Sequence, residues 1–366
     1  MASNRYLALD AFRGLTIALM ILVNTPGSWA AVYAPLLHAD WHGITPTDLI
    51  FPFFLFIIGS ALYFSLAKTN FECNRAAIFC VIKRAAIIVT LGILLNAYGH
   101  HDPLSELRLM GVLQRLGIAY GVAATLVLTL KPKPLICVAI LMLLGYWLFL
   151  LLAPVGEAFT LSGNIVRQFD LKVLGENHLW QGKGLAFEPE GLLSTIPAVV
   201  NVLIGFAATQ WLTGSQSKRN SIIELATVAV VMIGLALMWS QALPINKSLW
   251  TSSYVLFSSG CSLLVLVFFI WLVDIKKQVR LVNPLLVYGT NPMFIYVLSW
   301  LWVSSYYLID IPNSDGTSVN LNHYLYLQIN QLTGENLASL IFALLHVVLF
   351  WLISKVLHSN NIIVKV

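Results

Sequence analysis

The feature that most constrains this chain is a series of apolar runs, each about 20 residues long, the length an α-helix needs to cross a bilayer. The chain is 58% hydrophobic and only 10% charged, whereas soluble domains carry roughly 25% charged residues. A soluble core cannot absorb that much apolar surface. In hydrocarbon only helices or closed barrels satisfy their backbone groups, and these runs lack the alternation of strands. We therefore predict an all-α, polytopic integral membrane protein.

The pattern predicts about ten transmembrane helices, and the whole chain (1–366) is interpreted as one transmembrane domain. Most of the 21 lysines and arginines fall in the connections on one side, which places both termini in the cytosol. The first run is interpreted as a permanent helix rather than a cleaved signal peptide, because Asp10 stands where the signal's basic region would be. The long outer loops are about 28–47, 154–190 and 305–336. The predicted spans are 9–27, 48–67, 77–97, 109–130, 135–153, 191–212, 221–240, 252–273, 283–304 and 337–357.

Several classes of function are excluded by the residue patterns. The net charge is +5, but the basic residues sit in short connections as topology signals do, so no nucleic-acid partner is expected. The four cysteines have neither metal-ligand spacing nor a disulfide framework. No Walker A, G-x-S-x-G or H-E-x-x-H sequence occurs. We therefore expect no metal and no serine or zinc hydrolase chemistry.

A polar stretch follows the first run: His38-Ala-Asp-Trp-His-Gly-Ile-Thr-Pro-Thr-Asp48. Imidazole transfers protons near neutral pH, so His38 is either a catalytic residue or an interfacial histidine solvated by headgroups. The same two interpretations apply to His42. Thr45 and Pro46 are typical of a helix start, with Asp48 as the capping-box acid. Asp48 is therefore interpreted first as a structural residue and second as support for a site.

Two further candidates lie on spans. Asn24 precedes Thr25-Pro26-Gly27 at the end of the first span, where it is either a helix C-terminal residue or a side chain facing an outer cavity. Arg115 lies more than a turn inside the fourth predicted span. A buried arginine in a membrane is costly, so we expect it to face a partner or a wet cavity.

The remaining candidates have structural alternatives. Near the inner surface, Arg13 lies three residues after Asp10 on one helix face, as an anchoring ion pair or as a contact for an anionic ligand. Lys83 and Arg84 could join that contact, although positive-inside anchoring also explains them. Glu190 precedes the sixth span, where an acid favours the helix dipole, and Lys247 is a lone cation in an outer loop. Asn283-Pro284 and Asn291-Pro292 predict a helix start and a kink.

Taken in order, the motifs resemble one known family. They are Leu9-Asp-Ala-Phe-Arg-Gly-Leu15, Val23-Asn24, His38-Ala-Asp-Trp-His-Gly, Asp48-Leu-Ile-Phe-Pro-Phe-Phe, Val112-Leu-Gln-Arg-Leu-Gly117, Pro189-Glu-Gly-Leu-Leu193 and Pro244-Ile-Asn-Lys-Ser-Leu-Trp250. The chain resembles the heparan-α-glucosaminide N-acetyltransferase family of transmembrane acyltransferases, with its bacterial NagX-type members. The family's large luminal N-terminal domain and one preceding helix are not expected here, and the loop between Asn24 and His38 is longer. A small aminosugar is therefore a more plausible acceptor than a long heparan chain.

The resemblance implies transfer of the acetyl group of cytosolic acetyl-CoA to the amino group of a glucosamine-like sugar outside. It implies a homodimer in the bacterial inner (cytoplasmic) membrane, His38 as the active histidine and Asn24 as the site asparagine. Transfer is direct or passes through an acetyl-histidine. The alternatives are a sugar transporter without chemistry and a structural membrane partner. The expected supporting groups are Arg115, Asp48, Glu190 and Lys247 around the substrate or oxyanion, and Arg13, Lys83, Arg84 and Asn291 around the cofactor.

Overall fold

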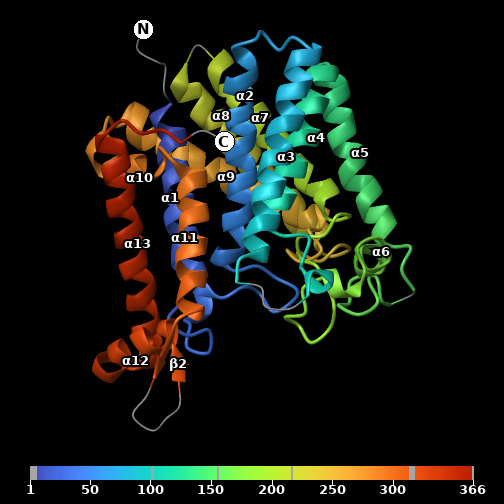
Figure 1. The fold of residues 1–366 in the computed structure, drawn as a ribbon. Coiled ribbons are helices and arrows are strands. Elements are labelled where there is room, and N and C mark those ends of the chain that lie inside the picture. The colour runs from blue at the N-terminus through green and yellow to red at the C-terminus, as the bar shows by residue number, and fades with distance from the viewer. Residues whose placement is uncertain (1–5, 100–102, 155, 216, 313–317, 365–366) are drawn as a thin grey trace. The chain divides into compact units, whose positions relative to one another are not determined.

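The computed structural model describes residues 6–99, 103–154, 156–215, 217–312 and 318–364, and most of them are helical (Figure 1). The chain divides into two compact units, which are described separately below. Unit 1 consists of Met1–His38, Thr45–Ile50 and Leu272–Val366. Unit 2 consists of Ala39–Ile44 and Phe51–Trp271.

Among the described residues, nine helices are long and apolar enough to cross a membrane, and the number is ten if a bent helix pair is counted as one span. This confirms the prediction of an all-α polytopic membrane protein. Each predicted run coincides with one of these spans, with ends that differ by a few residues. The spans are α1 (Leu7–Asn24), α2 (Ile50–Ala67), α3 (Arg75–Ala97), α4 (Val112–Thr129), α5 (Pro132–Leu150), α7 (Thr195–Gly214), α8 (Lys218–Trp239), α9 (Ser252–Ile270), the pair α10 (Val279–Tyr288) and α11 (Pro292–Tyr307), and α13 (Glu335–Ser359).

The bent pair confirms the predicted kink at Asn291-Pro292, where α10 and α11 meet at 60°. The prediction that Asn283-Pro284 marks a helix start is wrong, because α10 begins at Val279 and carries Pro284 inside it. Proline inside a helix removes one backbone hydrogen bond. Packing outweighs that loss: the Trp351 indole N–H donates to the Pro284 carbonyl at 3.1 Å, and α10 lies directly against α1.

In unit 1, α1 and α10 approach each other at backbone distance. A Cβ atom at Gly14 would clash with the Leu285 carbonyl, and one at Gly289 would clash with the Asp10 carbonyl. Small residues are what allow membrane helices to pack this closely. This contact fixes the first turns of α1 beside the break between α10 and α11.

The other end of unit 1 carries the predicted outer loop 305–336, which is more ordered than a loop. It contains an antiparallel hairpin, β1 (Asp310–Pro312) with β2 (Ser318–Asn320), and helix α12 (Leu321–Thr333). Figure 1 shows α12 and β2 at the end of α13 opposite α10. Asn322 Nδ2 donates to the Gly27 carbonyl at 3.0 Å. The chain leaving α1 is therefore tied to this end of the unit.

In unit 2, α7 is the central helix, because 72% of its apolar stretch is buried in the protein, compared with only 17% of that of α5. Gly59 of α2 and Gly205 of α7 each face the other helix's backbone so closely that a Cβ would clash. The predicted outer loop 154–190 contains helix α6 (Ile165–Leu174). It is held by a cluster of buried side chains, namely Tyr146, Leu150, Val166, Phe187, Leu193, Leu243 and Leu249. This cluster supports the polar groups described next.

Candidate functional site

The first polar constellation is a histidine–aspartate pair in unit 1. His38 Nδ1 lies 2.8 Å from Asp48 Oδ1. The Asp48 side chain is 1% exposed and the His38 side chain is 51% exposed. A buried carboxylate at hydrogen-bond distance makes Nδ1 the protonated nitrogen, because a carboxylate can only accept. The ring is thereby held in one tautomer, with its other nitrogen, Nε2, as the acceptor.

Asp48 also shapes the backbone that carries it. Its Oδ2 accepts the Thr45 backbone N–H at 3.0 Å and the Thr45 hydroxyl at 3.1 Å. Pro46 opens the 3₁₀ turn η2 (Pro46–Leu49), which leads into α2. The prediction that Asp48 is a capping acid is confirmed, since an acid at this position returns to the N-cap N–H. The same carboxylate thus starts a helix and orients His38.

The loop before His38 folds over the end of α1. Val23 and Pro26 from that end line a shallow groove together with Leu36 and with Ser339 of α13. The Thr47 hydroxyl donates to the Pro35 carbonyl at 3.2 Å, which ties the loop to η2. Asn24 is the last residue of α1 and its side chain is exposed. Its catalytic role stays a prediction.

The second constellation is centred on Arg115 in unit 2. The predicted span began at 109, but α4 begins at Val112, so Arg115 lies in its first turn. Just before the helix, Asn96 Nδ2 donates to the carbonyls of Arg108 and Met110, at 2.9 Å and 3.0 Å. Arg115 is nevertheless 0% exposed. The expectation that it needs partners is met by the contacts that follow.

The Arg115 guanidinium has one nitrogen with hydrogen-bond partners and two without. Its NH2 donates to the Gly191 carbonyl at 3.2 Å and to the Ser194 hydroxyl, and its Cζ lies 4.7 Å from the centre of the Trp250 ring. Nε and NH1 are buried with no hydrogen-bond partner. Unpaired buried donors are costly, so each of these two N–H groups is a donor that a carbonyl or anionic oxygen could satisfy.

Trp250 is itself a fully buried residue with φ 51°, a conformation that bulky residues rarely adopt. Its indole N–H donates to Asn201 Oδ1 at 2.9 Å. Asn201 Nδ2 in turn donates to the Ser259 hydroxyl at 2.8 Å. This chain of hydrogen bonds from the centre of α7 fixes the ring against Arg115.

Glu190 belongs to an ionic cluster beside Arg115. Arg108 forms a two-pronged pair with the buried Glu188, at 2.9 Å and 2.6 Å, and contacts Glu190 at 2.8 Å. Burial opposes the charge of Glu190, but Arg108, Arg115 and Lys247 together hold its pKa below the usual range. Glu190 is therefore a carboxylate among three cations. Lys247 also acts on Glu190 through its charge. Three of the predicted supporting groups, Arg115, Glu190 and Lys247, are therefore close enough to interact electrostatically.

The acid at the beginning of α7 is Asp170 of α6, not Glu190 as predicted. Helix α7 begins at Thr195, and Asp170 Oδ1 accepts the N–H groups of Leu192 and Leu193 at 3.1 Å and 3.4 Å. Its Oδ2 is buried without a partner. Burial raises the pKa of Asp170 to about 7. A Cβ at Gly191 would clash with this carboxyl group, so glycine is required where Arg115 and Asp170 converge.

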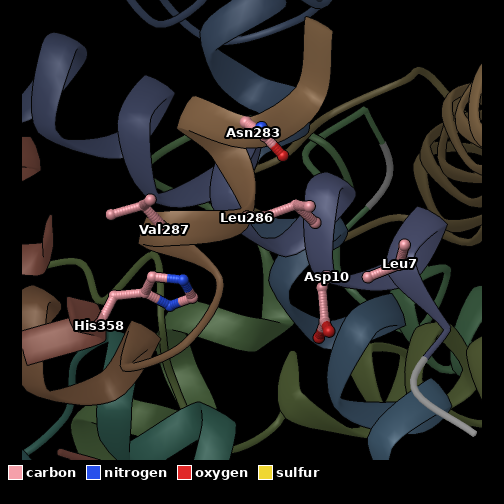
Figure 2. Close-up of a pocket in the computed structure, with 6 residues that line it drawn as sticks. All are labelled: Leu7, Asp10, Asn283, Leu286, Val287 and His358. Atoms are coloured by element: carbon pink, nitrogen blue, oxygen red, sulfur yellow. The ribbon is translucent and has the colours of Figure 1, made fainter. Parts of the chain in front are cut away.

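The predicted cofactor residue Arg13 is paired rather than open. Its NH1 lies 3.0 Å from Asp10 Oδ1 and donates to the Gly289 carbonyl at 3.3 Å. A neighbouring pocket of about 290 Å³ is lined by Asp10, not by Arg13. Figure 2 shows Asp10 and His358 on opposite sides of this pocket, with residues of α10 between them. The pocket therefore presents a carboxylate and an imidazole.

The other predicted cofactor residues have different surroundings. Asn291 is buried and holds the C-terminal segment: its Nδ2 donates to the Ile362 carbonyl at 2.9 Å, and its Oδ1 accepts the Val364 N–H at 2.8 Å. Lys83 and Arg84 are exposed on α3, and Arg84 lies 5.2 Å from the centre of the Tyr120 ring. Cofactor roles for these residues stay predictions, and one at Asn291 would require the C-terminal segment to move.

Some important residues had no clear signal in the sequence. Trp250 was singled out only as the last residue of the Pro244–Trp250 motif, Asn201 looks like an ordinary residue of an apolar run, and Asp170 looks like a solvated loop acid. Arg108 was assigned only to a connection. The one available sign was that Arg108, Glu188 and Glu190 are charges next to predicted span ends, where pairing is favoured over exposure to lipid.

Comparison with known proteins relates this chain to one family. Residues 5–246 match the family model described as "Heparan-alpha-glucosaminide N-acetyltransferase, catalytic". The human heparan-alpha-glucosaminide N-acetyltransferase is 30% identical over 353 residues, covering 80% of this chain and 52% of the human protein. The mouse protein is 28% identical, covering 81% and 53%. The chain spans about half the length of these relatives. The matched residues include the His38–Asp48 pair and, around Arg115, the charged residues Arg108, Asp170, Glu188 and Glu190. The chain belongs to the heparan-α-glucosaminide N-acetyltransferase family.

Proposed function

We propose that this chain is a bacterial inner-membrane acetyltransferase. It moves the acetyl group of cytosolic acetyl-CoA to the amino group of a glucosamine-like sugar on the periplasmic side, with His38 as general base. The observation that carries the proposal is the 2.8 Å contact between His38 Nδ1 and the buried Asp48. A carboxylate behind an imidazole fixes the tautomer in which Nε2 accepts a proton and stabilises the cation that forms.

The chemistry follows from this tautomer. The sugar ammonium gives one proton to His38 Nε2, which passes it to solvent, and the neutral amine then attacks the thioester carbonyl carbon. As the carbon–sulfur bond breaks, the nitrogen gives a second proton to His38 and the departing sulfur takes it, so the base is regenerated and one proton is released overall. We favour this direct attack over an acetyl-histidine intermediate, because Asp48 would stabilise the imidazolium of the direct route. General base catalysis is typically worth about 10²–10⁴-fold.

Asn24 is proposed to bind the thioester carbonyl or the amine, and Arg115 is proposed to supply positive potential for an oxyanion. The unpaired, buried Nε and NH1 donors of Arg115 support its part of the proposal, because preorganised donors in a buried site stabilise a tetrahedral oxyanion without reorganisation. Glu190, Lys247 and Asp48 support these groups by charge. Arg13, Lys83 and Arg84 are proposed contacts for the phosphates of the nucleotide, and a homodimer is the proposed assembly.

The test uses purified full-length protein in lipid nanodiscs with isotope-labelled acetyl-CoA and glucosamine. N-acetylglucosamine carrying the label is the expected product, detected by mass. His38→Ala should abolish transfer while calorimetry still shows acetyl-CoA binding. His323→Ala, which removes an exposed histidine of α12, is the matched control and should retain activity. Near-normal turnover by His38→Ala would refute the assigned base.

A sugar transporter without chemistry is the second candidate, favoured by one observation. The span formed by α10 and α11 is broken by 60°, and discontinuous helices form binding sites in many transporters. In proteoliposomes a transporter would accumulate unmodified sugar without acetyl-CoA. The acetyltransferase would form product only when acetyl-CoA and sugar are both supplied.

A further inference from the structure

The second histidine of the outer stretch, His42, has a well-defined hydrogen-bond environment in unit 2. Its Nδ1 lies 3.3 Å from Asn246 Nδ2, and Asn246 is 0% exposed. The neighbouring loop is closed by two bonds, because the Gly43 N–H donates to the Ile245 carbonyl at 2.8 Å and the Thr251 hydroxyl donates to the Pro244 carbonyl at 2.9 Å. His42 is thus held by a rigid partner.

The orientation of the Asn246 amide is fixed by its other end. Its Oδ1 accepts the Leu249 N–H at 2.8 Å. A flipped amide would point its NH₂ group at that N–H, which would leave two donors facing each other. The NH₂ group therefore faces His42, and His42 Nδ1 must accept.

This contact determines what the rest of the ring can do. In a neutral imidazole one nitrogen accepts and the other donates, so the proton of His42 is on Nε2. Partial burial lowers the pKa of His42, which keeps the ring neutral at pH 7. His42 therefore offers an N–H donor, whereas His38, bound to Asp48 through Nδ1, offers an acceptor. Two histidines four residues apart are locked in opposite tautomers.

The surroundings of His42 resemble the lining of a small-molecule site, where aromatic surface is combined with a few oriented polar groups. The Trp41 ring centre lies 6.1 Å from that of His42. Trp41 is itself fixed, since its indole N–H donates to the Phe159 carbonyl at 2.7 Å and its ring packs edge-on against Phe187 at 5.4 Å. The His42 side chain is exposed, so a ligand from solvent can reach it.

We propose that His42 is a specificity-determining residue whose Nε2–H donates a hydrogen bond to a hydroxyl oxygen of the sugar acceptor. The choice of an aminosugar as ligand rests on the proposed function. A neutral donor at an exposed position suits a neutral hydroxyl, and it contributes to binding rather than to proton transfer.

The experiment measures sugar binding directly, so that it does not depend on acetyl transfer. Full-length protein labelled with nitrogen-15 at histidine is placed in nanodiscs, and the His42 signals are assigned by their loss in His42→Phe. The expected spectrum is that of the Nε2–H tautomer, perturbed by glucosamine. His42→Phe should weaken glucosamine binding by about 3–10-fold, the value of one neutral hydrogen bond. His42→Gln, which places an amide N–H near the Nε2 position, should restore most of the affinity.

Deoxyglucosamines lacking one hydroxyl each identify the partner oxygen. The deoxyglucosamine that lacks the partner hydroxyl should bind the wild type with the same reduced affinity that glucosamine has for the His42→Phe variant. The same deoxyglucosamine should bind His42→Phe no more weakly than it binds the wild type. His323→Phe is the matched control and should bind like the wild type. The proposal would be overturned if neutral His42 carried its proton on Nδ1, or if His42→Phe bound glucosamine as tightly as the wild type. It would also be overturned if His42→Gln bound glucosamine as weakly as His42→Phe. Sugar binding with these features but without acetyl transfer would refute the proposed function alone.

Discussion

Replacement of Asp48 by asparagine tests whether one carboxylate both starts a helix and sets the tautomer of His38. Asp48 accepts hydrogen bonds on both oxygens, from His38 Nδ1 and from the Thr45 N–H. Asparagine has the same shape but only one acceptor oxygen. If that oxygen keeps the Thr45 N–H, the NH₂ group faces His38 Nδ1 and forces the proton onto Nε2. The base is then lost although His38 is still present.

The expected loss follows from the role of the base. General base catalysis contributes about 10²–10⁴-fold, which equals about 2.7–5.4 kcal/mol of transition-state stabilisation at 1.36 kcal/mol per decade. The wrong tautomer in a serine protease triad costs about 10⁴-fold, so we expect Asp48→Asn to lose at least about 10²-fold in kcat. The cost to folding should stay below about 2 kcal/mol, the upper cost of losing a helix cap, because the cap bond to Thr45 is retained.

The assay is single-turnover acetyl transfer under saturating acetyl-CoA, together with calorimetric acetyl-CoA binding and thermal unfolding in the same nanodiscs. Thr47→Val is the matched control, because Thr47 lies in the same turn and its hydroxyl donates to the Pro35 carbonyl; it should lose stability and keep kcat. A kcat within about 3-fold of wild type for Asp48→Asn would refute the tautomer argument.

Two further predictions concern stability. The pKa of Asp170 is raised to about 7 by burial, above its unfolded value of about 3.9, so its contribution to stability is complete below about pH 4 and is lost as pH rises through about 7. Wild-type thermal midpoints should fall between pH 5 and pH 8, and Asp170→Asn should flatten that slope; equal slopes would contradict the assignment. Gly14→Ala should destabilise by about 1–3 kcal/mol, because its Cβ meets the Leu285 carbonyl. Gly145→Ala, whose Cβ meets nothing within 4 Å, should show no loss in the same thermal unfolding assay, and equal midpoints for the two variants would refute the close-packing argument.

Most of the membrane architecture was predictable from the sequence, because hydrophobic length and backbone satisfaction leave few alternatives in a bilayer. The ten runs became nine spans and one bent pair. The kink at Asn291-Pro292 followed from the geometry of proline, and the cap at Asp48 followed from the spacing of Thr45, Pro46 and Asp48. These features depend on residues that are close in the sequence, so tertiary contacts did not change them.

The parts that sequence reasoning missed depend on contacts between distant residues. Nothing in the spacing of His38 and Asp48 distinguishes a ring paired with its cap from one solvated by headgroups. The pairing of Arg108 with Glu188 and the capping of α7 by Asp170 join a span end to a loop helix. Pro284 lies inside α10 rather than at a helix start, because the packing of α10 against Gly14 outweighs the local preference of proline. In each case tertiary packing decided between alternatives that the local pattern left open.

The geometry of α1 restricts the acyl donor that the proposed reaction can use. Arg13 contacts Asp10 near the start of α1, and Asn24 is its last residue. Asp10 and Asn24 are separated by about 21 Å along the helix, at 1.5 Å per residue. A donor whose phosphates contact Arg13 must therefore carry its acetyl group across most of the hydrocarbon core to reach the loop that bears His38. A long donor with its phosphates at one end and its thioester at the other, such as acetyl-CoA, can do this, whereas acetyl phosphate cannot. Acetyl phosphate should consequently fail as a donor even at concentrations far above those of acetyl-CoA, and efficient transfer from it would show that Arg13 is not a phosphate contact.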